Sequence, residues 1–256
     1  MTPLAGRGAL VTGVSRRAGI GFAIAGRLRD LGADVVVQGF GGHDAAQPWG
    51  EDPEGTAGLA AELGVPALEA DFTDAAAPAA CLAAAADAVG HIDILVANHA
   101  MSCDQSLEQL DAAAIDATLA VNVRGTLLLV QAYAARHDDA RPGGNVILFT
   151  SGQHLEPMAR ELPYAASKAA IHGLTGSLAD HLAPRGIRVN TVNPGPTDTG
   201  WATPELTEFE MRRLPFGRWG APEDAARLVA WLAGDESAWI TGQVITSDGG
   251  FSLARP

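Results

Sequence analysis

The sequence predicts an α/β protein, in which a parallel sheet of about seven strands carries helices on both faces in a single Rossmann-type, doubly wound domain over residues 1–256. Two observations lead to this prediction. Short apolar, β-branched runs alternate with longer helical segments, which is typical of parallel strands buried on both faces. A glycine-rich segment follows the first of these runs. No repeat or composition shift divides the 256 residues.

The strands and helices are expected in alternation. The strands are expected over Ala9–Thr12, Val35–Gln38, Ala67–Ala70, Ile92–Ala97, Asn145–Thr150, Arg188–Asn193 and Gln243–Ser247. The helices are expected over Ile20–Leu31, Glu54–Leu63, Ala75–Val89, Ala112–Arg136, Tyr164–Ala183 and Pro222–Ala233. Pro222 suits the first turn of its helix because its missing N–H has no intrahelical partner there. Gly39–Pro53 is left as a long loop, either functional or mobile.

Composition excludes several classes of function. The formal charge of −13 argues against a nucleic-acid partner, which would need clustered cations. Cys81 and Cys103 are too few for a disulfide framework and lack metal-ligand spacing, so no metal is expected. No apolar run approaches the roughly 20 residues that span a bilayer, and the chain runs into a strand without a leader. We therefore expect a cytoplasmic protein without a membrane partner.

Lys168 is the only lysine in the chain, and it stands four positions after Tyr164, one of two tyrosines. Residues four apart share one face of a helix. A nearby cation favours the phenolate, so we expect Lys168 to lower the pKa of Tyr164. A solvated surface lysine is the alternative, but the scarcity of both residue types favours a functional pair.

The first strand is followed by a glycine-rich turn that opens a helix. Glycines allow a tight turn and close backbone approach to a pyrophosphate, whose charge is favoured at a helix N-terminus. A dinucleotide-binding turn is therefore predicted, with candidate contacts Gly13, Ser15, Arg16, Arg17, Gly19, Ile20 and Gly21.

Tyr164 and Lys168 form a YxxxK element, and Ser151 stands thirteen positions before Tyr164. Together with the glycine-rich turn, these motifs resemble the short-chain dehydrogenase/reductase family over essentially the whole chain. Five residues, rather than the family's three, separate Gly13 from Gly19. This departure resembles members that are similar to 3-oxoacyl-carrier-protein reductases.

The resemblance implies a catalytic set of Asn122, Ser151, Tyr164 and Lys168. Tyr164 would exchange a proton with the carbonyl or alcohol oxygen, and Ser151 would donate a hydrogen bond to that oxygen. Tyr164 and Lys168 would also contact the cofactor, and Lys168 would bind the nicotinamide ribose. Asn122 would hold a water that links Lys168 to solvent; as structure alone, it would bond to backbone within a helix.

The resemblance also implies further cofactor contacts. Asp71 and Phe72 match the pair that brackets the adenine; otherwise Asp71 is a loop or cap residue. Asn98 is retained from the family's NNAG segment and should bond to neighbouring backbone, whereas the adjacent His99 is expected to be structural rather than titrating. The remaining contacts come from the PGxxxT segment and are Pro194, Gly195, Thr197 and Thr199.

NADP(H) is favoured over NAD(H) as the cofactor. The second strand ends at Gln38-Gly39-Phe40 without the carboxylate that usually binds an unphosphorylated ribose. Arg16 and Arg17 suit a 2′-phosphate. The alternative is that both arginines are solvated and that Asp44 or another loop acid reaches the ribose.

The expected reaction interconverts a ketone and a secondary alcohol, as in a ketoreductase, with a 3-oxoacyl or other lipophilic, polyketide-type substrate. Substrate contacts are expected from Ser151, His154, Tyr164 and Trp201, with an apolar lid over residues 200–215 that includes Phe209. Two alternatives remain open: a non-redox dehydratase or epimerase, and a catalytically silent dinucleotide-binding regulator. The resemblance also implies a homo-oligomer, a dimer or tetramer, built from the two longest helices.

Overall fold

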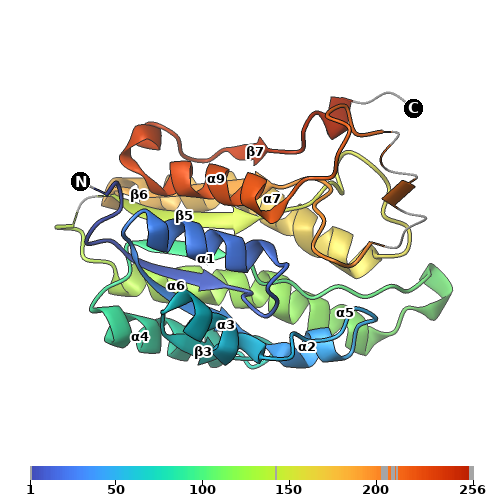
Figure 1. Cartoon of the computed structure of the whole chain (residues 1–256), viewed down its shortest axis with the longest axis horizontal. Coiled ribbons are helices and arrows are strands. Elements are labelled where there is room, and N and C mark those ends of the chain that lie inside the picture. Colours follow the sequence, from blue (N-terminus) through green and yellow to red (C-terminus); the bar gives the residue numbers. More distant parts are fainter. Residues whose placement is uncertain (1, 142, 203–206, 209–210, 212, 254–256) are drawn as a thin grey trace.

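The computed structural model of the chain describes residues 2–141, 143–202, 207–208, 211 and 213–253. Its parallel strands form a seven-stranded sheet in the order β3-β2-β1-β4-β5-β6-β7. The strands are β1 (Gly8–Thr12), β2 (Asp34–Gly39), β3 (Ala67–Glu69), β4 (Ile94–Ala97), β5 (Gly144–Phe149), β6 (Ile187–Asn193) and β7 (Val244–Thr246). Helices lie on both sides of this sheet (Figure 1), which confirms the predicted doubly wound α/β fold class.

The helices cover the sheet in two layers. They are α1 (Ile20–Asp30), α2 (Gly41–Ala45), α3 (Gly55–Leu63), α4 (Ala77–Val89), α5 (Ala112–Leu119), α6 (Thr126–Arg136), α7 (Leu162–Leu182) and α9 (Pro222–Ala233). Residues of α1, α3 and α9 belong to one core cluster, and residues of α4, α6 and α7 belong to the other. Each face of the sheet therefore has its own apolar layer.

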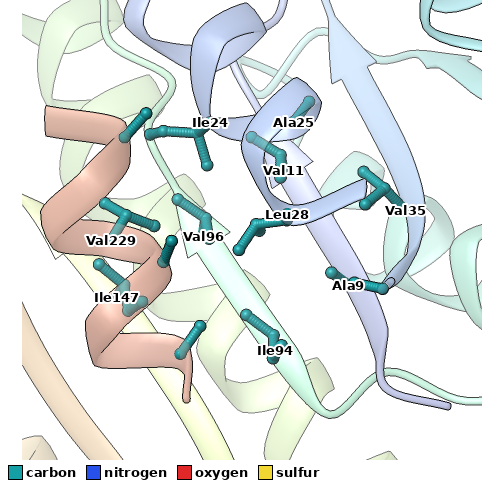
Figure 2. Packing of buried hydrophobic residues seen from close by; sticks show 14 of the residues in the cluster. Ala9, Val11, Ile24, Ala25, Leu28, Val35, Ile94, Val96, Ile147 and Val229 are labelled. Atoms are coloured by element: carbon teal, nitrogen blue, oxygen red, sulfur yellow. The ribbon is translucent and has the colours of Figure 1, made fainter. Parts of the chain in front are cut away.

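The central strands are buried on both faces, as their unbroken apolar runs predict. In β1, Val11 packs in the first cluster while its neighbour Leu10 packs in the second, because successive side chains of a strand point to opposite faces. Figure 2 shows Val96 of β4 between Ile24 of α1 and Val229 of α9, which belong to the same core cluster.

The predicted helix over 112–136 is continuous in the chain but not regular. A π-helical turn, Ala120–Gly125, separates α5 from α6. By length and composition alone, Ala112–Arg136 could cross a membrane, which corrects the expectation that no segment is long enough. Core helices pass the same test, and α6 contributes Leu129, Val130 and Tyr133 to the core.

The other differences from the sequence prediction lie mostly at element ends. The helix expected from Tyr164 starts at Leu162, with Pro163 in its first turn, where proline is favourable. The long loop after β2 contains the short helix α2, in which Asp44 is buried. The second change places the buried carboxylate of Asp44 in the segment that follows β2.

Candidate active site

The candidate site lies at the carboxyl edge of the sheet, where the strand order reverses. From β1 the chain continues outward through β2 and β3, and then returns to β4 on the other side of β1. Ligands of open α/β sheets bind outside the carboxyl ends of the strands at such a switch point. The segments that follow β1, β4, β5 and β6 therefore converge on the site.

The glycine-rich turn packs tightly against the end of β4. Gly13 has a positive φ of 72°, and a Cβ there would lie 2.8 Å from the backbone of His99. A Cβ on Gly21 would lie 2.5 Å from the carbonyl oxygen of Gly13. Asn98 Nδ2 donates to the carbonyl oxygens of Thr12 at 3.1 Å and Gly13 at 3.2 Å. The prediction that the Asn98 side chain hydrogen-bonds to neighbouring backbone is confirmed.

The turn fits the pyrophosphate of a dinucleotide. Helix α1 begins after Gly19, which makes no side-chain cap, and its first turn contains no acidic residue. The first N–H groups, around Ile20, therefore lack a side-chain cap and meet no competing carboxylate in that turn. A Cβ on Gly19 would lie 2.9 Å from the carbonyl oxygen of Arg16. Any larger residue at position 19 would therefore force the turn to open.

His99 is a structural residue, as predicted. The imidazole is buried, with Nδ1 2.7 Å from Thr12 Oγ1 and Nε2 3.3 Å from Thr126 Oγ1. Burial, assisted by the charge of Lys168, lowers the pKa of His99 to about 3. The edge of Phe72 packs against this neutral ring, with centroids 4.6 Å apart.

Phe72 and Asp71 both have partners within the protein. Phe72 is 3% exposed and belongs to the core. Asp71 Oδ1 accepts a hydrogen bond from the backbone N–H of Thr73 at 2.9 Å, which is the local turn role considered as the alternative. Their predicted contact with adenine stays a prediction.

The side chains of Arg16 and Arg17 point to different partners. Arg17 is exposed and pairs with Glu62 at 2.6 Å and Glu54 at 3.2 Å. Arg16 donates to Thr199 in the loop after β6 and lies 3.4 Å from Asp44. The two arginines do not converge on the end of β2.

Asp44 is the centre of a polar cluster that sequence reasoning did not foresee. Its buried carboxylate accepts hydrogen bonds from the Ser15 hydroxyl and, at 2.9 Å, from Trp49 Nε1, and it pairs with Arg16. From the sequence, Asp44 is expected only as a possible ligand of the ribose. An isolated acidic residue in a polar loop does not indicate that its side chain will be buried and bonded to Ser15, Trp49 and Arg16.

Helix α7 carries the tyrosine and lysine on the face that looks toward β5. Lys168 Nζ lies 5.5 Å from the centroid of the Tyr164 ring and donates to the carbonyl oxygen of Phe149 at 3.0 Å. Ser151, just after β5, is placed so that its hydroxyl lowers the pKa of Tyr164. The structure thus brings together the three side chains predicted from their spacing, and their catalytic roles stay predictions.

The electrostatics of the pair differ from the sequence expectation. Burial raises the pKa of Tyr164 to about 12; the hydrogen bond from Ser151 opposes this rise and the charge of Glu161 adds to it. Burial lowers the pKa of Lys168 to about 8. The expectation that Lys168 brings the pKa of Tyr164 below its ordinary value is wrong for this structure, because burial disfavours the phenolate and outweighs the lowering of the pKa by Ser151.

Glu161 is a second carboxyl that the sequence analysis missed. It immediately precedes α7 and forms a backbone bridge with Gln105 in the loop after β4. Burial, together with the charge of Asp104, raises its pKa. The sequence did contain a signal for this residue: Glu161 stands three positions before Tyr164, the proposed proton donor, which is less than one helical turn.

Asn122 lies in the π-helical turn and is 2% exposed. Its Nδ2 donates to the carbonyl oxygen of Met101 at 2.8 Å and to Ser167 Oγ at 2.9 Å, while Oδ1 accepts from the N–H of Met101 at 2.7 Å. The side chain therefore joins this turn to the loop after β4 and to α7, whereas the structural alternative was a bond to backbone within one helix. Its role in a water relay stays a prediction from resemblance.

The segment after β6 is held by its own backbone contacts. Gly195, which follows Pro194, has a φ of 64°, and a Cβ there would lie 2.3 Å from Asp248 Cβ. Thr197 Oγ1 donates to the carbonyl oxygens of Pro194 and Gly195, at 3.3 and 3.2 Å. The backbone oxygen of Thr199 accepts a hydrogen bond from the guanidinium of Arg16. These contacts fix the segment beside the candidate site.

The predicted substrate residues lie around the outer edge of this site. Trp201 is 43% exposed, and its ring packs edge-on against Trp219 at 5.9 Å. The ring of His154 lies 4.7 Å from that of His172 on α7. Part of the expected lid lies outside the described residues, namely 203–206, 209, 210 and 212, which include Phe209. Substrate contact by Trp201 and His154 stays a prediction.

Comparison with known proteins agrees with this geometry. The family model described as enoyl-(acyl carrier protein) reductase matches residues 13–252. An uncharacterized oxidoreductase of Bacillus subtilis, YjdA, is 41% identical over 95% of this chain and 96% of its own length. The cyclohexanol dehydrogenase of a Rhodococcus species is 34% identical over 98% of both. The structure of a short-chain dehydrogenase/reductase from Serratia marcescens aligns with a TM-score of 0.83 at 35% identity, covering 98% of this chain and 99% of that one.

Proposed function

The chain belongs to the short-chain dehydrogenase/reductase family of oxidoreductases, and we propose that it interconverts a ketone and a secondary alcohol with NADP(H). The observation that carries this proposal is the cluster of Ser151, Tyr164 and Lys168 at the carboxyl edge of the sheet. It lies beside a turn and a helix N-terminus that fit a pyrophosphate.

The proposed chemistry assigns one task to each side chain. The bound dinucleotide supplies or accepts the hydride. Tyr164, protonated at neutral pH because its pKa is raised to about 12, donates its proton to the carbonyl oxygen during reduction. Ser151 donates a hydrogen bond to the same oxygen and stabilises its developing negative charge. Lys168, held by the carbonyl oxygen of Phe149, fixes the nicotinamide ribose.

The preference for NADP(H) is supported by the end of β2. A Cβ on Gly39 would lie 2.1 Å from Thr56 Oγ1 and 2.7 Å from the carbonyl oxygen of Val14. Position 39 therefore has no room for the carboxylate that would bind an unphosphorylated ribose. The preceding Gln38 is also engaged, because its amide bonds to Gly13 and Ala70. Arg17 remains the cation through which we expect the 2′-phosphate to be recognised.

The substrate is proposed to be a lipophilic ketone or its alcohol. Trp201 is the exposed aromatic side chain at the edge of the site, and aromatic side chains predominate in the walls of small-molecule pockets. The cyclohexanol dehydrogenase among the relatives is named for a lipophilic alcohol of this kind. A 3-oxoacyl substrate belongs to the same class.

A homo-oligomer, dimer or tetramer, is part of this proposal. The outer face of α7 carries the small, exposed residues Ala166, Ala169, Gly173 and Gly176. Apart from the adjacent backbone of α7 itself, no atom of the described residues lies within 4 Å of a Cβ added at Gly173 or Gly176, so a second helix could approach closely. Light scattering of the purified protein measures the mass that decides this point.

An absorbance assay at about 340 nm, where the reduced nicotinamide absorbs, tests the function and the cofactor together. We expect ketone-dependent loss of NADPH absorbance, with kcat/KM at least about tenfold higher than with NADH. In Arg17→Ala this preference should fall several-fold, while Arg29→Ala, which removes a distant surface arginine, should retain it. Product formation without any absorbance change would favour the non-redox alternative. A preference that is unchanged in Arg17→Ala, and also in the Arg16→Ala/Arg17→Ala double variant, would contradict the assignment of the 2′-phosphate to Arg17.

The charge of Glu161 should be visible in the pH profile. This carboxylate raises the pKa of Tyr164, so Glu161→Gln should lower that pKa. Alcohol oxidation needs the phenolate, and its rate rises with pH up to the pKa of Tyr164. The ascending limb of kcat against pH should therefore move to lower pH in the variant, by a few tenths to about one unit. Glu108→Gln, an exposed carboxylate in the loop after β4, is the matched control, and a shift to higher pH would contradict the argument.

A further inference from the structure

The side chain of Arg16 joins two loops that are distant in the sequence. Its Nη1 donates to the backbone oxygen of Thr199 at 3.0 Å, and its Nη2 to Thr199 Oγ1 at 3.4 Å. On its other side, Nε lies 3.4 Å from Asp44 Oδ1, and the guanidinium lies 5.3 Å from the centroid of the Trp49 ring. One cation therefore links the glycine-rich turn, the segment after β2 and the segment after β6.

The position of the strands gives this contact its significance. Arg16 follows β1 and Thr199 follows β6, and the sheet places both β4 and β5 between those strands. Neighbouring strands are about 4.8 Å apart, so the ends of β1 and β6 are separated by about 14 Å. The Arg16–Thr199 contact therefore crosses the carboxyl ends of β4 and β5, beyond which Asn98 and Ser151 lie.

Asp44 holds the guanidinium in this position. Its carboxylate is 7% exposed and also accepts the hydroxyl of Ser15 and the indole N–H of Trp49. A carboxylate already fixed by two other partners, Ser15 and Trp49, orients the planar guanidinium of Arg16 at little further loss of side-chain freedom. The opposite edge of that fork is then directed at the two oxygens of Thr199.

We infer that Arg16 is a clasp over the candidate dinucleotide site, a positioning residue that ties Thr199 to the glycine-rich turn and slows the release of bound dinucleotide. This inference rests on the proposed function only in taking that site to hold a dinucleotide. It differs from the sequence-based interpretation of Arg16 as a ligand of the 2′-phosphate. Because the guanidinium is engaged by Thr199 and Asp44, the clasp acts on the phosphorylated and unphosphorylated dinucleotides alike.

Dissociation rates of NADPH and NADH, measured by stopped-flow fluorescence on the full chain, test the clasp. Arg16→Ala is expected to release both dinucleotides about tenfold faster, with the ratio of the two rates changed by less than about twofold. Arg16→Lys retains the charge beside Asp44 but not the fork, and its release rates should be intermediate. Asp44→Asn keeps the shape of the anchor without its charge and should accelerate release by a smaller factor than Arg16→Ala.

The controls separate the clasp from simple destabilisation and from the proposed function. Arg227→Ala removes an exposed arginine of α9 and should release dinucleotide at the wild-type rate, and the melting temperature without cofactor reports folding of each variant. Unchanged release from folded Arg16→Ala would overturn the clasp, as would acceleration of NADPH alone. Failure of the wild-type chain to bind either dinucleotide would overturn the proposed function and the clasp with it.

Discussion

Tyr164→Phe should lower kcat for ketone reduction by at least about 100-fold while the dissociation constant of the dinucleotide stays within about twofold. The variant removes one hydroxyl and keeps the ring that packs 5.5 Å from Lys168 Nζ. Ser151 loses its hydrogen-bond partner on α7 but remains available to a substrate oxygen. The loss therefore falls on proton transfer and leaves the binding of the cofactor intact.

The other tyrosine provides a matched control. Tyr133 is buried on α6, where its hydroxyl donates to the carbonyl oxygen of Asp93 at 2.7 Å and accepts from the N–H of Asn145 at 3.0 Å. Tyr133→Phe makes the same chemical change away from the cleft, so it should lower stability without lowering kcat of the folded enzyme. Full activity of Tyr164→Phe would exclude Tyr164 as the proton donor. A cellular role that survives the loss of turnover in this variant would favour the silent dinucleotide-binding regulator.

The sheet and the position of the tyrosine–lysine pair could be predicted because local patterns determine them. Consecutive apolar residues such as Val35–Val37 identify a strand buried on both faces. The i,i+4 spacing of Tyr164 and Lys168 places them on one face of any helix that contains both. The earlier start of α7 also had a local signal, Pro163, which suits a first helical turn.

The features that could not be predicted depend on tertiary contacts. The π-helical turn at Asn122 interrupts an apolar pattern that reads as one helix, and it is accompanied by bonds from Asn122 to Met101 and Ser167. Arg16 meets Thr199 across 183 positions of the chain. The pKa of Tyr164 is set mainly by burial. The extent of that burial cannot be inferred from the residues next to Tyr164 in the sequence.

Away from the cleft, Asp93 is the residue whose loss should destabilise the fold most. It lies between β4 and the preceding loop, at the amino-terminal edge of the sheet, and is 1% exposed. Its carboxylate accepts from Arg141 Nε at 2.9 Å and from the N–H of Gly8 at 3.1 Å, and it lies 3.0 Å from His91 Nε2. Burial acts to raise its pKa, but the hydrogen bonds and positive charges outweigh burial and leave the pKa lowered.

Asp93→Ala removes the carboxylate that accepts these hydrogen bonds. The buried N–H of Gly8 and the partly buried guanidinium of Arg141 then lose this partner. Leaving the buried N–H of Gly8 without its acceptor costs about 1–3 kcal/mol of unfolding free energy, measurable by urea denaturation at neutral pH. Because the pKa of Asp93 is lower in the folded chain, the stabilisation by its charge is present above the unfolded-state pKa near 3.9 and is lost as pH falls below it. The difference between wild type and variant should therefore shrink below about pH 4. Asp30→Ala is the control, because it breaks an exposed ion pair with Arg29, and it should leave the urea midpoint nearly unchanged. If the two substitutions had equal effects, Asp93 would not anchor this edge of the sheet.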